Sequence, residues 1–154
     1  MSTKSYSDKQ EKLIANYLGW SQVVGSGSRP TFTGDVISDN WLGECKTHVE
    51  PNHRISFSIS VWNKIVAEAS AKFKQPAYFV DDGSQKEERT WVMFMARELS
   101  SRFNSVEYPY TINNTTTFKH GEMKARTPDM TIYTLHFGDY DVMICSLETF
   151  YNII

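Results

Sequence analysis

The segment Thr33–Lys46 constrains this chain most, because it holds two carboxylates and an amine in one short and otherwise mostly apolar run. Val36–Ile37 and Trp41–Leu42 are residue types that favour β-strands. Ser38–Asn40 lies between them and has the chemistry of a turn. Two strand-like pairs on either side of a polar turn predict a β-hairpin.

The register of this hairpin follows from its loop. If Asp39–Asn40 forms the loop, Asp35 falls directly opposite Glu44, and opposite residues of an antiparallel pair share a face. Side chains alternate along a strand, so Glu44 and Lys46 should point one way and Cys45 the other. Two converging carboxylates suit Mg²⁺, and an amine beside them can hold or deprotonate a water.

The same residues resemble a nuclease signature. Asp35 followed by Glu44–Lys46 is similar to the PD-(D/E)xK motif, with Gly34 where that motif often has proline. Over about residues 8–97, the expected order of elements resembles archaeal-type Holliday junction resolvases and their phage-encoded relatives. That order is a helix with a glutamate, a strand, a Ser/Gly loop, the hairpin, a helix and a strand. The segments that carry it outside the hairpin are Gln10–Ile14, Val23–Arg29, Val61–Ala69 and Lys74–Val80.

The resemblance implies a fold and a substrate. The fold would be α/β and restriction-endonuclease-like, with a central mixed β-sheet flanked by helices. One nuclease domain would span residues 1–154, with its core at about 8–97 and a C-terminal extension at about 98–154. The substrate would be branched DNA. Junction cleavage needs two symmetric nicks, which implies a homodimer.

The resemblance also implies roles for individual residues. Asp35 and Glu44 would bind one or two Mg²⁺ ions, with Mn²⁺ as a possible substitute. The backbone carbonyl of Cys45 and the side chain of Glu11 would complete the metal environment. Lys46 would orient the attacking water, because nearby carboxylates favour the charged amine. The residues expected to hold the scissile phosphate are Ser26, Ser28 and Arg29.

Two of these assignments have a second interpretation. Asp8 resembles a helix N-cap, and Glu11 three residues later would complete a capping box for a helix that ends near Gly19. Capping and metal binding by Glu11 do not exclude each other. The loop Gly25–Pro30 is either flexible or brings backbone N–H groups and hydroxyls close to an anion, and its place just before Asp35 favours the anion.

Composition limits the possible functions. The net charge of −2 counts against a strong nucleic-acid binder, unless basic side chains gather on one face. Candidates for such a face are Lys46, Arg54, Lys64, Lys72 and Lys74. Cys45 and Cys145 lack metal-site spacing and are expected as reduced thiols, and His48 and His53 are expected at the surface or facing phosphate. With no long apolar run and a polar start, we expect no membrane association and a cytoplasmic setting, either of the cell itself or of a phage-infected host.

The remaining elements are expected as follows. A helix near Val61–Phe73 should bury Trp62, and Pro76–Val80 with Thr90–Ala96 should form a second hairpin. Asn113–Thr117 should be a loop. The last predicted elements are strands at Met130–Phe137 and Val142–Cys145, and a terminal helix capped by Ser146.

The sequence leaves three other interpretations of these residues open. A different PD-(D/E)xK endonuclease, of restriction or repair type, would use the same residues on linear or flapped duplex. A non-catalytic module with the same fold would bind DNA or protein. In the simplest alternative, Asp35, Glu44 and Lys46 are solvated charges on an exposed hairpin.

Overall fold

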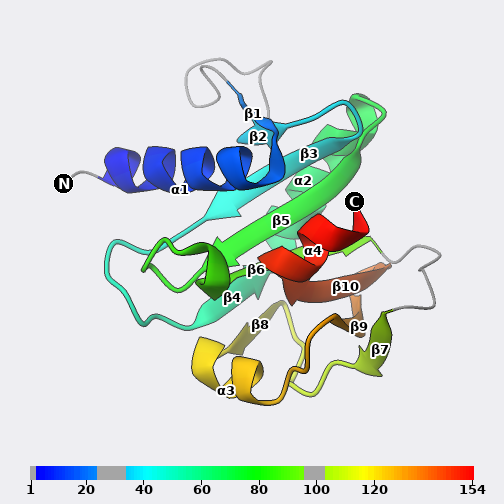
Figure 1. Ribbon diagram of the computed structural model, residues 1–154. Helices are drawn as coiled ribbons and strands as arrows, with labels where there is room; N and C mark the ends of the chain where they lie inside the picture. Colours follow the sequence, from blue (N-terminus) through cyan, green and yellow to red (C-terminus); the bar gives the residue numbers. More distant parts are fainter. Residues whose placement is uncertain (1–2, 24–33, 96–102) are drawn as a thin grey trace.

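The computed structural model describes residues 3–23, 34–95 and 103–154 (Figure 1). Within them, an eight-stranded mixed sheet has the order β1-β2-β3-β5-β6-β10-β9-β7, and β4 and β8 form a second, two-stranded sheet. The strands of the large sheet are β1 (Ser21–Gln22), β2 (Val36–Ile37), β3 (Trp41–Lys46), β5 (Gln75–Asp81), β6 (Thr90–Met95), β7 (Asn104–Glu107), β9 (Thr131–Phe137) and β10 (Tyr140–Ser146). The other elements are β4 (Ile55–Ser58), β8 (Thr115–Phe118), α1 (Thr3–Leu18), α2 (Ile59–Ala71), α3 (His120–Ala125), α4 (Leu147–Ile153) and the short 3₁₀ helix η1 (Glu87–Arg89). The predicted α/β class, with a central mixed sheet flanked by helices, is confirmed.

Strands β2 and β3 form the predicted hairpin in the predicted register. The backbone N–H of Ser38 donates to the carbonyl of Trp41 at 3.0 Å, and the Ser38 hydroxyl accepts from the Trp41 N–H at 3.1 Å. These bonds close the turn around Asp39–Asn40. The paired residues are Val36 with Gly43 and Ile37 with Leu42.

A crossover then returns the chain parallel to β3. Parallel neighbours cannot be joined by a tight turn, and here the connection contains β4 and α2. Ser58 caps α2 by accepting a hydrogen bond from the N–H of Val61 at 3.3 Å. β6 pairs antiparallel with β5, which confirms the second hairpin. In the parts of the chain that the structure describes, no helix has the length and apolar character needed to cross a membrane.

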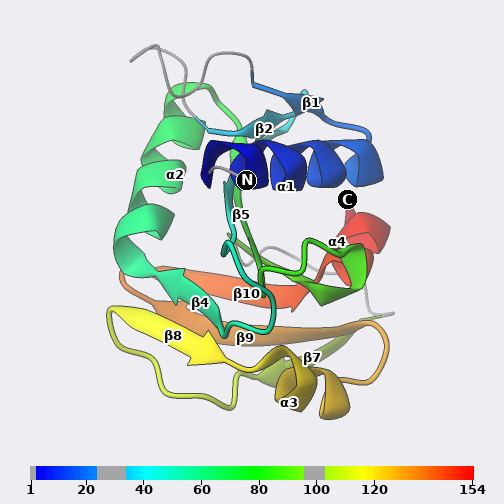
Figure 2. The ribbon, with the colours of Figure 1, turned by 90° about the vertical axis from the view of Figure 1, so that its left-hand side faces the viewer.

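The large sheet separates two hydrophobic cores. Because side chains alternate along β5, Tyr78 packs on the side of Trp62 from α2, while Phe79 packs against Ile14 of α1 and Phe150 of α4. Figure 2 shows this layering, with α2 on one side of β5 and α1 and α4 on the other. Trp62 is fully buried, as predicted.

The C-terminal third continues the same sheet. β10 pairs antiparallel with both β6 and β9, and β7 pairs parallel with β9. The predicted strands near residues 130–137 and 142–145 are confirmed, as is the Ser146 cap, which accepts from the N–H of Thr149 at 3.2 Å. The predicted loop at Asn113–Thr117 is wrong in its second half. There β8 pairs with β4, and the hydroxyls of Ser56 and Thr117 lie 2.7 Å apart.

The N-terminal helix begins earlier than predicted. α1 starts at Thr3, so Asp8 lies inside the helix and is not its N-cap. The side-chain amide of Gln85, in the connection between β5 and β6, donates to the carbonyl of Tyr6 at 2.6 Å. This contact between segments far apart in sequence holds the first turns of α1, and local sequence gives no sign of it.

Candidate active site

Asp35 is held at the open end of the hairpin by backbone hydrogen bonds. Its N–H donates to the carbonyl of Gly43 at 2.8 Å, and its Oδ2 accepts from the N–H of Cys45 at 2.8 Å. The register of β2 and β3, continued by one residue, places Asp35 opposite Glu44. Glu44 is only 6% exposed. Two carboxylates therefore meet at the open end of the hairpin, Glu44 buried and Asp35 half-buried.

Lys46 lies beside Glu44 as the strand alternation predicts. Its Nζ is 3.5 Å from Glu44 Oε1, and its side chain is 52% exposed. Cys45 points into the core on the opposite face and, like Cys145, is a free thiol. The structure thus joins a buried carboxylate to an amine that reaches solvent.

Helix α1 brings Glu11 to the same place. Glu11 is 8% exposed and accepts a hydrogen bond from the amide of Gln22 in β1 at 3.4 Å. It lies in the middle of α1, so the predicted capping role is wrong. Its neighbour Gln10 donates through Nε2 to the backbone carbonyl of Lys46 at 2.6 Å. This bond ties α1 to the end of β3.

The electrostatics of this cluster are unfavourable in the absence of a cation. Burial, reinforced by the charge of Asp35, raises the pKa of Glu11 to about 7. Burial, reinforced by the charge of Glu44, raises the pKa of Asp35 to about 6, although Lys46 and Lys64 act in the opposite direction. Of the three hairpin charges, Glu44 is buried and so is not a surface charge, whereas the Lys46 side chain is 52% exposed.

The donors at this site fit a hard divalent cation that keeps part of its water shell. In a strand, the N–H and C=O of one residue point to the same side, so the Cys45 carbonyl faces the Asp35 side of β3. Gln10 Oε1 is buried without a hydrogen-bond partner among the described residues. Within the described residues, no three His, Cys, Asp or Glu side chains form a ready-made metal cluster. Mg²⁺ commonly binds through one or two carboxylates and several waters, which matches this donor set.

The other predicted site residues have different outcomes. Ser26, Ser28 and Arg29 lie outside the described residues. The rings of His48 and His53 stack on each other with centroids 4.2 Å apart. Burial and the neighbouring His53 lower the pKa of His48, and in the described chain neither ring belongs to a metal cluster.

Gln10 and Gln22 are site residues that sequence reasoning missed. For Gln10 a signal existed, because it shares the helical stripe of Ile14 and Leu18 at intervals of four residues, and a buried amide on an apolar stripe needs a partner. For Gln22 there was no such signal, since β1 is a short edge strand with an ordinary polar composition.

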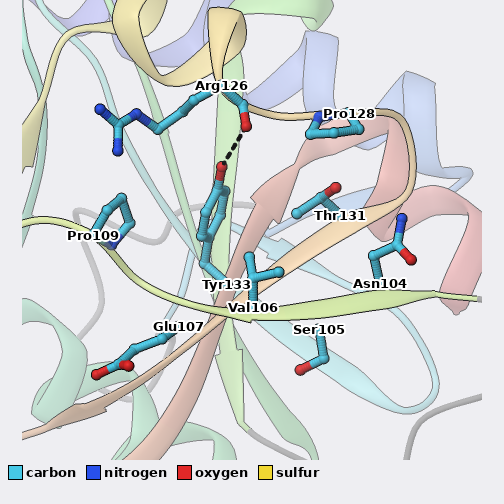
Figure 3. Close-up of a pocket in the computed structure, with 9 residues that line it drawn as sticks. All are labelled: Asn104, Ser105, Val106, Glu107, Pro109, Arg126, Pro128, Thr131 and Tyr133. Atoms are coloured by element: carbon cyan, nitrogen blue, oxygen red, sulfur yellow. Dashed lines mark hydrogen bonds between the residues drawn. The ribbon is translucent and has the colours of Figure 1, made fainter.

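A cavity of about 410 Å³ lies at the opposite edge of the sheet, next to β7 and β9 (Figure 3). It contains one cation, Arg126, and one carboxylate, Glu107, on different segments. The Tyr133 hydroxyl donates to the Arg126 carbonyl at 3.4 Å. Its lining offers no pair of converging carboxylates, so we place the candidate chemistry at Asp35 and Glu44.

Comparisons with protein-family models, with curated proteins and with solved structures found no match to this chain. The function is therefore inferred from the geometry and chemistry of the site.

Proposed function

We propose that this protein is a divalent-metal-dependent endonuclease of the PD-(D/E)xK type, which hydrolyses phosphodiester bonds in branched DNA. The observation that carries the proposal is the meeting of Asp35, Glu44 and Lys46 at the end of one hairpin, with Glu11 beside them. Buried carboxylates with raised pKa values are characteristic of functional sites.

The arrangement of the elements supports the proposal. From α1 through β1, the hairpin, α2 and β5, the chain follows the order that the resolvase resemblance implies. β3, which carries Glu44 and Lys46, pairs with β2 on one side and with β5 on the other. It therefore lies inside the sheet and not at its margin. The candidate carboxylates are thereby attached to a rigid element, which a positioned metal site needs.

Asp35 and Glu44 would hold the metal, together with the Cys45 carbonyl and Glu11. A bound Mg²⁺ or Mn²⁺ lowers the pKa of a coordinated water and offsets charge on the phosphate. Asp35 is kept in place by the Cys45 N–H, and Glu11 by Gln22. Both carboxylates must lose their protons to accept a cation, which their raised pKa values place near neutral pH.

Lys46 would orient the attacking water. Its amine is paired with Glu44 and more than half of its side chain is exposed, so it can contact both the metal-binding carboxylate and an incoming phosphodiester. We assign it an orienting role and not that of a general base, because its amine is already paired with Glu44.

Two alternatives use the same site differently. An endonuclease of restriction or repair type would share every residue named above and differ in substrate. A non-catalytic binding module is favoured by the net charge of −2.

Paired nicks in a junction would also require a homodimer, which sedimentation or light scattering would detect.

The test is a nicking assay with Mg²⁺ on a panel of four-way junction, fork, flap and linear duplex. Wild-type protein should make paired symmetric cuts in the junction, and Asp35→Asn, Glu44→Gln and Lys46→Ala should each abolish them. The matched control is Lys9→Ala, which removes an exposed lysine of α1 and should cut normally. Cutting of linear duplex would indicate the restriction or repair type. No cutting with either Mg²⁺ or Mn²⁺, or normal rates in all three site variants, would reject the nuclease.

A further inference from the structure

A second cavity, of about 360 Å³, lies beside the connection between β5 and β6. Basic side chains from three separate parts of the chain border it, together with one carboxylate. They are His53 and Arg54 before β4, Asp82 and Arg89 in the β5–β6 connection, and Lys119 and His120 at the start of α3. From the sequence, Arg54 is predicted among the possible DNA-binding residues, and His53 at the surface or facing phosphate.

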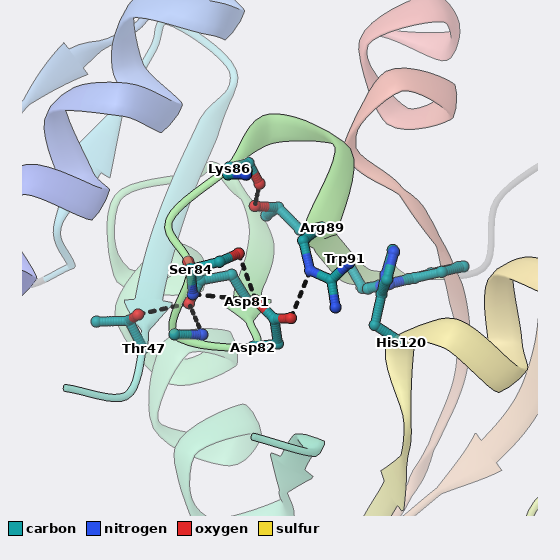
Figure 4. A network of polar contacts seen from close by, with 10 residues as sticks. Thr47, Asp81, Asp82, Ser84, Lys86, Arg89, Trp91 and His120 are labelled. Carbon is teal, nitrogen blue, oxygen red and sulfur yellow. Dashed lines mark hydrogen bonds and ion pairs between the residues drawn. The ribbon is translucent and has the colours of Figure 1, made fainter. Parts of the chain in front are cut away.

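The single carboxylate in this cavity is already neutralised. Asp82 is buried and accepts from Ser84 and from Arg89 Nε, as Figure 4 shows. Burial alone would raise the pKa of Asp82, but these hydrogen bonds hold that pKa below its ordinary value. Among the described residues, Arg54 and Lys119 form no ion pair. The cavity therefore keeps an excess of positive charge.

His120 is fixed as a neutral hydrogen-bond donor. The indole N–H of Trp91 can only donate, and it donates to His120 Nδ1 at 3.0 Å. The remaining proton of the neutral ring must then lie on Nε2. Burial and the nearby Arg89 lower the pKa of His120, which favours this neutral form. Figure 4 shows Arg89 lying between Asp82 and His120.

Close packing fixes the floor of the cavity. The N–H of His53 donates to the carbonyl of Asp82 at 2.9 Å. Gly83 has a φ of +96°, and a Cβ there would lie 1.9 Å from the carbonyl oxygen of Glu50. The loop before β4 is thus held directly against the β5–β6 connection, and only glycine fits at the contact.

The cavity lies at the same end of the sheet as Lys46. Thr47 follows Lys46, and its hydroxyl donates to Asp81, the neighbour of Asp82. Lys74, by contrast, precedes β5 and is bound to the carbonyls of Ser38 and Asp39 at the other end of the hairpin. Of the five residues predicted as a basic face, Lys74 therefore lies apart from Lys46, and Arg54 lies at the cavity.

We propose that this cavity binds a phosphate group of the DNA substrate other than the one that is cleaved. Arg54 and Lys119 would supply charge, Arg89 its free guanidinium nitrogens, and His120 a directed N–H. A planar guanidinium with an adjacent ammonium and a fixed N–H donor suits the several oxygens of a phosphate. The DNA part of this proposal depends on the proposed nuclease function, whereas the phosphate part does not.

The first experiment is an NMR titration of the whole protein with inorganic phosphate, following the imidazole resonances of His120. We expect a saturable shift in wild type that is lost in the double variant Arg54→Ala/Lys119→Ala. Both side chains border the cavity without an ion pair among the described residues, so the variant should fold, and its spectrum reports folding directly. A missing shift in wild type, or the same shift in the double variant, would overturn the phosphate site.

The second experiment measures binding of a labelled four-way junction without divalent metal, so that nothing is cut. The double variant should bind at least tenfold more weakly. The plot of log association constant against log salt concentration should also become shallower, with the magnitude of its slope smaller by about one to two. Lys9→Ala/Lys12→Ala removes the same charge from the exposed side of α1 and should bind within about twofold of wild type. Equal losses in both double variants, or none in either, would overturn DNA as the source of the phosphate. Phosphate binding in a protein that neither binds nor cuts DNA would keep the anion site and reject the nuclease.

Discussion

Two groups of acidic side chains near the same end of the sheet have pKa shifts in opposite directions. Asp82 receives hydrogen bonds from Ser84 and Arg89, and these lower its pKa despite burial. Asp35 is half-buried and Glu11 buried near other carboxylates, and their pKa values rise to about 6 and about 7. The first arrangement stabilises the fold by itself. The second destabilises the fold at neutral pH, and the cation that we propose for this site would offset that repulsion.

The largest expected effect comes from breaking the satisfied pair. Asp82→Asn leaves Arg89 without its carboxylate in a largely buried place and should lower the free energy of unfolding by about 3 kcal/mol. Urea denaturation measures this. The control is Asp141→Asn, which removes an exposed partner of His136 and should cost less than about 0.5 kcal/mol. Equal effects in the two variants would mean that the Asp82 network does not stabilise the fold.

Removing a charge from the other group should have the opposite sign. The folded-state pKa of Asp35 is raised, so its ionisation reduces stability as pH rises from about 4 through about 6. Asp35→Asn should therefore raise the free energy of unfolding by about 1–2 kcal/mol at pH 8 without metal, and much less at pH 4. Asparagine keeps an oxygen for the Cys45 N–H. A variant less stable than wild type at pH 8 would contradict the account.

The raised pKa of Glu11 offers a finer test of the same cluster. In Asp35→Asn, the pKa of Glu11 should fall because the charge of Asp35 is gone, but should stay above its ordinary value because burial is the larger cause. Asp8→Asn should lower it less, since Asp8 contributes less to the shift. Carbon-detected NMR titration of the glutamate carboxyl measures all three proteins. A larger effect from Asp8 than from Asp35 would place Glu11 away from the site.

These contrasts also explain what the sequence could predict. The hairpin was predictable down to its register, because Ser38–Asn40 has turn chemistry and the strands beside it are short. The Ser146 cap was equally local. The start of α1 depends on Gln85 and the strand β8 on a partner near residue 57, and neither contact is visible along the chain.

The candidate site divides in the same way. Asp35, Glu44 and Lys46 lie on one hairpin, so their spacing was enough to bring them together. Gln22 and the cavity near His120 come from segments that only the folded sheet assembles. The interpretation of Glu11 as a cap was wrong because the helix continues for two more turns toward its N-terminus.

Only a small effect on stability is expected at Lys46. Its ion pair with Glu44 is half exposed, so Lys46→Ala should change the free energy of unfolding by less than about 1 kcal/mol while abolishing cleavage. Thermal unfolding measures the effect of this substitution on stability, and the nicking assay measures its effect on cleavage. A large loss of stability would make Lys46 a structural residue.

The most direct test of the account is a calorimetric titration of the protein with Mg²⁺ at pH 8, repeated at pH 6 in buffers of different ionisation enthalpy. We predict saturable binding at pH 8 that is absent in Asp35→Asn and Glu44→Gln, and weaker binding at pH 6 accompanied by proton release from the carboxylates. Binding that is unchanged in both variants, or no binding by wild type with either Mg²⁺ or Mn²⁺, would contradict a metal site at Asp35 and Glu44.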